Sequence, residues 1–155
     1  MRRVKQIILS GLVLTAAAAA PAPAQETMQA PSSQTAPVLT VLTREDPQTQ
    51  LMALILTRAS ARQGVPVRVL LCDKAGDLAL AEPPEAATRP LAPRNMSPHG
   101  LLETLIEDGV TVQVCAIYLP NSPHSAEDLH SEIGVATPPE IATIMADPRT
   151  RFFTF

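Results

Sequence analysis

The 155-residue sequence contains no tryptophan, one tyrosine and three phenylalanines, so its core must be built from aliphatic side chains. It has only two cysteines, which excludes a small scaffold held together by several disulfides. Lys and Arg number 12 against 15 Asp and Glu, and this acidic balance argues against a general nucleic-acid binder, which needs a basic face. The usual phosphate-binding, zinc-protease and serine-hydrolase motifs are also missing. We therefore expect no cofactor and no nucleic-acid partner.

Residues 1–24 have the pattern of a secretory signal peptide. Three basic residues near the start precede a short apolar run at 7–20, and an A-x-A cleavage pattern ends at Ala24. The alternative is a retained membrane anchor, but the run is shorter than the roughly 18 residues that a spanning helix needs. We expect cleavage after Ala24, a periplasmic or secreted product, and no membrane association afterwards. Cleavage leaves nine basic against 15 acidic residues, a net charge of −6.

The mature sequence predicts a flexible leader followed by one α/β domain. Residues 25–37 lack periodic apolar positions, which is typical of a flexible segment. Over 38–155, β-favouring runs alternate with amphipathic stretches, and Asp46-Pro47 and Ser97-Pro98 have the form of helix starts. The alternation predicts a mostly parallel sheet with helices on both faces. The expected strands cover 38–42, 65–72, 110–118, a short segment near 135, and 151–155.

Two further features concern the connections. Ser125 with Asp128, and Thr137 with Glu140, have the spacing of capping boxes and predict two more helix starts. Residues 75–94 contain four prolines, so we expect no regular element there. A loop of that length is either a functional lid, binding loop or subunit contact, or a surface insertion.

The two cysteines carry most of the chemical argument. Cys72 and Cys115 lie near the ends of the second and third expected strands, where the functional crevice of a parallel sheet is found. They are too far apart in sequence for a CxxC motif, and no metal-ligand spacing joins them to His99, His124 or His130, so we predict no metal site. Three interpretations fit Cys115: a small buried hydrophobe, a disulfide partner of Cys72, or a reactive thiol.

The order of several short motifs resembles the DsrE/DsrF-like family of sulfur-relay proteins. Val-Gln-Val-Cys-Ala at 112–116 follows Leu-Ile-Glu-Asp-Gly-Val-Thr, and Gln-Gly-Val-Pro-Val-Arg-Val-Leu-Leu occupies 63–71. The opening strand with its Asp-Pro helix, Asp-Leu before Gly134-Val135 and the closing Phe-Phe-Thr-Phe complete the pattern. The resemblance covers about 38–155, which is essentially the whole mature domain.

The resemblance implies a three-layer α/β/α sandwich around a five-stranded parallel sheet, and association as a trimer or hexamer. It also implies that Cys115 carries a persulfide sulfur. Three departures stand beside it. Cys72 adds a possible resolving or disulfide partner. Relay members are cytoplasmic, whereas this sequence has an export signal. The segment after Cys115, Ala-Ile-Tyr-Leu-Pro-Asn-Ser-Pro, lacks the Arg-Gly of relay members.

We therefore predict a periplasmic protein that binds or transfers sulfane sulfur through Cys115, with unidentified sulfur donor and acceptor. At most it is a sulfur carrier or transferase rather than a turnover enzyme. The alternative is a non-catalytic oligomeric binding or structural protein whose cysteines are buried or disulfide-linked.

Pairing of the cysteines depends on strand order. Neighbouring second and third strands would stand about 4.8 Å apart, within disulfide reach, whereas an intervening first strand would double that separation. By alternation, Cys115 shares a face with Gln113, and Cys72 shares one with Arg68 and Leu70. We expect Cys115 to be the more exposed and reactive thiol, and the two not to form a permanent disulfide.

Overall fold

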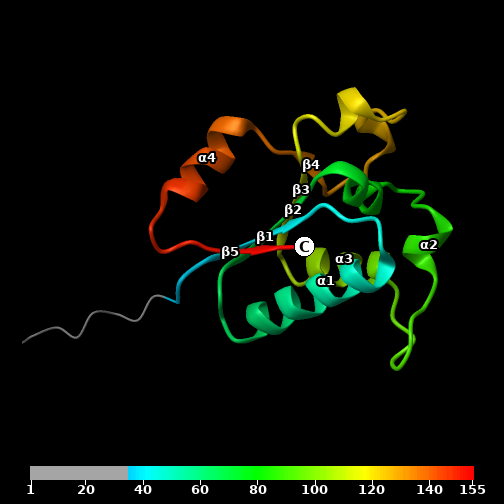
Figure 1. Ribbon diagram of the computed structural model, residues 1–155, viewed down its shortest axis with the longest axis horizontal. Helices are drawn as coiled ribbons and strands as arrows, with labels where there is room; N and C mark the ends of the chain where they lie inside the picture. The colour runs from blue at the N-terminus through cyan, green and yellow to red at the C-terminus, as the bar shows by residue number, and fades with distance from the viewer. Residues whose placement is uncertain (1–34) are drawn as a thin grey trace, which may run out of the picture. The chain divides into compact units, whose positions relative to one another are not determined.

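Five parallel strands form one sheet in the part of the chain that the computed structural model describes, residues 35–155 (Figure 1). The predicted signal peptide and nearly all of the predicted leader lie outside the described residues. The strand order is β4-β3-β2-β1-β5, and every neighbouring pair is parallel, which confirms the expected sheet. The strands are β1 Val38–Leu42, β2 Val67–Leu71, β3 Thr111–Val114, β4 Gly134–Val135 and β5 Arg151–Thr154.

Helices cover both faces of this sheet, so the fold is the expected three-layer α/β arrangement. Figure 1 shows α1 and α3 on one face and α4 on the other. The α-helices are α1 Pro47–Arg62, α2 Glu85–Thr88, α3 Pro98–Glu107 and α4 Pro138–Ala146. Three short 3₁₀ helices join them: η1 Asp73–Ala79, η2 Leu119–Asn121 and η3 Ala126–Asp128. Within residues 35–155, no helix is long and apolar enough to cross a membrane.

Capping side chains, prolines and glycines mark the ends of the two longest helices, α1 and α3. The Asp46 carboxylate accepts a hydrogen bond from the Thr49 N–H at 2.8 Å, and Ser97 caps α3 in the same way. Each helix has a proline at its start, where the missing N–H costs nothing. Gly64 and Gly109 follow the helix ends with φ of 77° and 82°, a region that favours glycine. These starts and stops confirm the sequence interpretation.

The two predicted capping boxes have different outcomes. Ser125 and Asp128 form theirs, but only one 3₁₀ turn follows, because Leu129 leaves it to pair with Leu80 in an antiparallel bridge. Thr137 stands at the start of α4 without a side-chain capping bond. Its expected partner, Glu140, bonds to side chains of the sheet instead.

Two sequence predictions are wrong, one about an irregular segment and one about the end of a strand. The segment 75–94 contains regular structure, because η1 runs into it and α2 begins directly after Pro84, where proline sets the helical start. The third strand stops at Val114 rather than continuing to Tyr118. There the chain turns, with the Tyr118 N–H donating to the Cys115 carbonyl at 2.9 Å.

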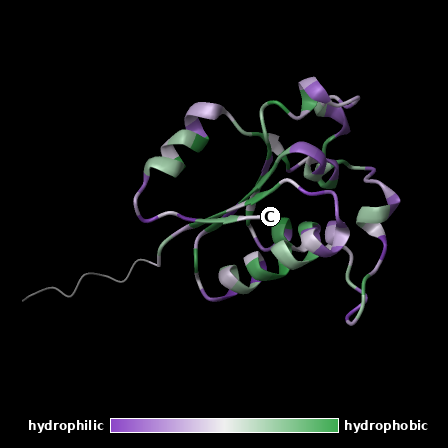
Figure 2. Cartoon of the chain, in the orientation of Figure 1, coloured by the Kyte–Doolittle hydropathy of each residue, from purple (hydrophilic) through white to green (hydrophobic). Residues whose placement is uncertain are grey.

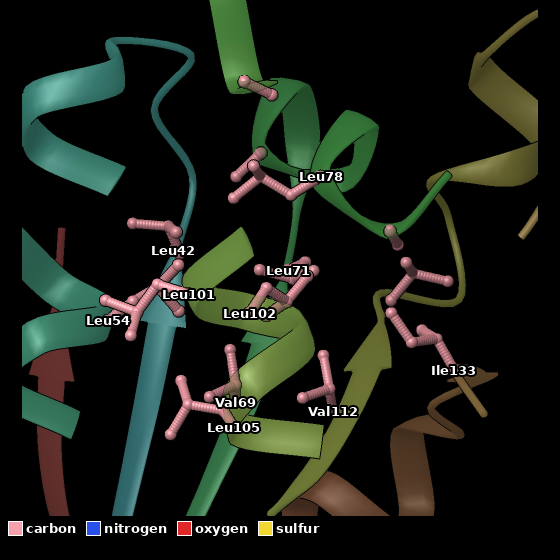
Figure 3. Close-up of a cluster of buried hydrophobic side chains, with 14 of the residues drawn as sticks. Leu42, Leu54, Val69, Leu71, Leu78, Leu101, Leu102, Leu105, Val112 and Ile133 are labelled. Atoms are coloured by element: carbon pink, nitrogen blue, oxygen red, sulfur yellow. The ribbon is translucent and has the colours of Figure 1, made fainter. Parts of the chain in front are cut away.

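The main core lies between the sheet and the α1–α3 layer. Leucine and valine side chains from these helices and from β1, β2 and β3 converge there, as Figure 3 shows. Polar side chains are buried in this layer as well, and the buried hydroxyls of Thr40 and Thr57 share a 2.7 Å hydrogen bond between β1 and α1. Apart from Tyr118, the fully packed side chains of this cluster are aliphatic, as the composition predicted.

The opposite face of the sheet is covered only thinly. Its apolar cluster has three buried members, Leu39, Leu70 and Ala136, and α4 adds only half-buried Ile141 and Ile144. In Figure 2 the strands are largely hydrophobic, while α4 mixes hydrophobic and hydrophilic residues. A second set of side chains on this face is polar, and consists of Arg68, Gln113 and Glu140.

We predict that the α4 attachment weakens in acid. Arg68 donates a hydrogen bond to Glu140, Gln113 adds a second, and together they lower the pKa of the Glu140 carboxyl from 4.5. Because the folded pKa is the lower one, this stabilisation is complete above pH 4.5 and is lost as the pH falls through the folded pKa. Glu140→Gln should therefore lower the urea midpoint at neutral pH but leave it almost unchanged in strong acid.

The exposed Glu127 offers a control, because its side chain has no bonding partner in the described residues. Glu127→Gln should match the unmodified protein at both pH values. A Glu140→Gln deficit of the same size at neutral and acid pH would contradict the assignment of the acid-labile contribution to this carboxylate.

Candidate functional site

The carboxyl edge of β2 and β3 brings the two cysteines together. The strands are neighbours, with Leu71 opposite Val114, so the next residue on each strand is a cysteine. The Cα atoms of Cys72 and Cys115 are 5.0 Å apart, and their sulfurs form a disulfide. This is the neighbouring arrangement in which the sequence argument placed the cysteines within bonding distance.

The sheet holds both cysteine backbones in place. The Cys72 N–H donates to the Leu42 carbonyl, and the Cys115 N–H donates to the Leu71 carbonyl, each at 2.8 Å. Both side chains are half-buried and pack against the apolar cluster on the α4 face. The predicted side-chain phase is confirmed, because Leu70 belongs to the same cluster.

The structure shows the two cysteines joined, and no cysteine among the described residues is free. The physical reason is that adjacent strands and matching side-chain phase bring both sulfurs to one edge and one face. The interpretation of Cys115 as a disulfide partner therefore holds for this state. Our expectation that this bond is not permanent stays a prediction, as does the greater reactivity of Cys115.

A cavity of about 560 Å³ adjoins the disulfide at the carboxyl edge. Ile117, Tyr118, Pro123 and the disulfide form the apolar part of its wall, and the remaining lining is polar or charged. Because Lys74 and His124 stand beside two aspartates there, the cavity offers hydrogen-bond donors and acceptors of both kinds. Its lining consists of Cys72, Asp73, Lys74, Asp77, Cys115, Ile117, Tyr118, Asn121, Ser122, Pro123 and His124.

A tyrosine that the sequence analysis did not single out supports one side of the cavity. The Tyr118 ring is buried, and its hydroxyl donates to Asp77 Oδ1 at 2.8 Å. Burial, with the hydrogen bond and negative charge of Asp77, raises the pKa of Tyr118 well above its usual 10.0. Gly76 makes room for the ring, since a Cβ there would meet Tyr118 at 2.3 Å. The available signal was its position: it is the sole tyrosine, three residues after Cys115.

The histidines do not gather at the disulfide. His124 lines the cavity. His99 is buried elsewhere, with its Nδ1 3.1 Å from the Leu78 carbonyl oxygen, and the His130 Nδ1 accepts from the Glu132 N–H. No group of three or more His, Cys, Asp or Glu side chains among residues 35–155 is placed to hold a metal ion.

Comparison with known proteins supports this architecture. No family model and no curated protein matches the sequence. Among solved structures, the ychN protein from E. coli superposes with a TM-score of 0.61 at 18% identity, over 77% of this chain and 98% of that one. The MTH1491 protein of unknown function from Methanobacterium thermoautotrophicum gives 0.55 at 15% identity, over 76% and 97%. The likeness shows the fold alone.

The site has a defined chemical capacity. A disulfide is opened when a thiolate attacks one sulfur and the other leaves as thiolate. Cys72 and Cys115 are half-buried beside a cavity that has both apolar and polar walls, so opening the bond would leave two thiols beside that cavity. Such a pair can exchange disulfides or hold an additional sulfur atom as a persulfide.

Proposed function

We propose that this chain is an exported DsrE-like carrier of sulfane sulfur, acting in the periplasm or as a secreted protein. Cys115 holds the transferred sulfur and Cys72 is the resolving cysteine. The observation that carries the proposal is the adjacency of the two sulfurs at a cavity on the carboxyl edge of the sheet. The resemblance supports the choice of Cys115, since the family's sulfur-bearing cysteine follows the third strand.

The reaction sequence begins with a reductant of the dithiol class. It opens the disulfide, is itself oxidised to a disulfide, and leaves Cys72 and Cys115 as thiols. The Cys115 thiolate then attacks the outer sulfur of a donor persulfide, and the donor departs as its thiolate. Cys115 now carries a persulfide. An acceptor thiolate takes the outer sulfur, or the Cys72 thiolate attacks the Cys115 sulfur, expels hydrosulfide and restores the disulfide.

Alkylation of the native protein tests the assignment. Without reductant, the disulfide should block labelling of both cysteines. After mild reduction, a small alkylating reagent should label Cys115 faster than Cys72. Ready labelling of Cys72 with Cys115 spared would overturn the carrier as we have placed it, and so would resistance of both cysteines to labelling after reduction.

The disulfide itself favours one rival. In that alternative, the protein is a non-catalytic binding or structural protein, and the bond is a permanent link between β2 and β3. The rival predicts that reductants acting on folded protein leave the bond intact. Intact mass after mild reduction separates the two, because only the carrier gains two hydrogens while it remains folded.

We further propose that the chain forms a homo-oligomer, a trimer or hexamer, through the α4 face. The support is that face's thin cover: α4 has no buried residue, and Phe152 and Met145 are 43% and 58% exposed. Light scattering should give a trimeric or hexameric mass, and Phe152→Glu should lower it. Met52→Glu, at a 52% exposed position on α1, is the matched control and should not. A monomer mass at micromolar concentration would contradict the assembly.

A further inference from the structure

A groove on the α1–α3 side of the molecule has no part in the sulfur chemistry. It lies between one stripe of α1, the segment 91–96 and the start of α3, and encloses about 390 Å³. Its lining includes Leu51 and Leu101, which are only 8% and 3% exposed, and Ile55, which is 38% exposed. The volume falls within the roughly 300–1,000 Å³ typical of small-molecule sites.

The charge of this groove is opposite to that of the protein. Arg58, Arg62 and Arg94 line it, and no Asp or Glu does. They are three of the nine basic residues that follow Ala24, in a segment whose net charge is −6. Concentrating one third of the positive charge on one apolar groove gives it electrostatic complementarity to an anion.

Two of these arginines form no ion pair with a carboxylate of the described residues. Arg58 Nε donates to Asp108 Oδ2 at 2.9 Å, which ties α1 to the end of α3. Arg62 and Arg94 have no ion pair and no side-chain hydrogen bond within residues 35–155. A guanidinium presents parallel N–H groups that match the two oxygens of a carboxylate.

The wall that carries Arg94 is held in place. Leu91 and Met96 form an antiparallel bridge, with the Leu91 N–H donating to the Met96 carbonyl at 2.9 Å. Both side chains are half-buried and line the groove, so its apolar wall is present before any ligand arrives. A preformed wall reduces the ordering that a ligand must bring about on binding.

We propose that this groove binds a small amphipathic anion, an unbranched aliphatic chain with one terminal carboxylate. The apolar body lies against Leu51, Ile55 and Leu101. The carboxylate accepts hydrogen bonds from Arg62 and Arg94. The site shares no residue with the cavity at the disulfide, so it is independent of the proposed sulfur carrier.

Calorimetric titration of the full-length chain with decanoate tests the proposal. We expect saturable binding to one site, and none of decyltrimethylammonium, which has the same tail and the opposite charge. Arg62→Gln and Arg94→Gln should each weaken decanoate binding about tenfold, as expected for loss of a charge-assisted hydrogen bond. Arg151→Gln, an exposed arginine on β5 outside the groove, should leave the affinity unchanged.

A pair of variants on α1 separates a specific loss of binding from a loss caused by misfolding. Ile55→Glu places a negative charge in the wall of the groove, at a position that is 38% exposed, and should abolish binding. Met52→Glu makes the same change outside the groove and should not. Equal binding by both variants, equal binding of the cationic amphiphile, or no saturable binding would overturn the proposal. A change of oligomer mass in Ile55→Glu, without decanoate binding to the unmodified chain, would instead assign the groove to a second copy.

Discussion

Replacing Cys115 with serine is expected to reduce sulfur retention by the reduced protein to the background level. A serine hydroxyl is a poor nucleophile toward a persulfide, and Cys72 alone would then have to take the sulfur. Cys72→Ser should have the opposite effect and hold sulfur on Cys115 longer than the unmodified protein does. Without the Cys72 thiolate, nothing in the pair can attack the Cys115 sulfur and expel hydrosulfide.

The measurement is hydrosulfide release over time from reduced, sulfur-loaded protein. The unmodified chain should release it as the disulfide returns, Cys72→Ser should release it slowly, and Cys115→Ser should have little to release. Ser122→Ala, a change in the same cavity lining, controls for general disturbance of the site. Equal retention by Cys115→Ser and the unmodified protein would remove Cys115 from its proposed role.

Reduction of the disulfide is expected to lower the free energy of unfolding by about 4 kcal/mol. The bond closes a chain segment with a sequence separation of 43, and the loop-closure entropy it removes from the unfolded chain corresponds to that amount. Urea unfolding of the oxidised and reduced protein gives the difference directly. It is large beside the 5–15 kcal/mol or so of total stability that is typical of a domain.

The double variant Cys72→Ser, Cys115→Ser is the matched control. It should resemble the reduced protein and be insensitive to reductant. Identical urea midpoints for oxidised and reduced protein would contradict the entropic contribution that we assign to loop closure in the unfolded chain.

These two predictions give the disulfide a double role. It stabilises the fold while closed, and it keeps Cys115 from alkylation or sulfur loading until a reductant opens it. The sheet supports this use, because the Cys72 and Cys115 backbones are each bonded to the neighbouring strand. We therefore expect the carboxyl edge to keep its arrangement when the sulfurs separate. The 560 Å³ cavity then gives the opened pair access to a small sulfur donor.

The sequence predicted those parts of the fold that depend on local pattern. The apolar runs marked β1, β2, β3 and β5, a short strand was expected near Val135, and Asp46 and Ser97 marked the starts of α1 and α3, because capping and proline placement are local interactions. Alternation along β2 also predicted that Cys72 shares a face with Leu70. The likeness of the fold to solved structures came from the order of these elements rather than from identity, which is 18% or less.

Features that depend on tertiary contacts could not be predicted in this way. The spacing of Thr137 and Glu140 favoured a capping box, but the Glu140 carboxylate accepts a hydrogen bond from Arg68 of β2. The Tyr118 contact with Gly76 and Asp77 joins segments about 40 residues apart, and no local pattern signals it. Pairing of the cysteines depended on strand order, which the sequence left open between two arrangements.

The most direct test of the central claim is peptide-level mass spectrometry of the reduced protein after brief exposure to a polysulfide donor, stopped by alkylation. We predict one additional sulfur on the peptide that contains Cys115, none on the peptide that contains Cys72, and loss of that sulfur on treatment with dithiol. Return to the disulfide with no added sulfur ever found on Cys115, or added sulfur on Cys72 alone, would contradict the account.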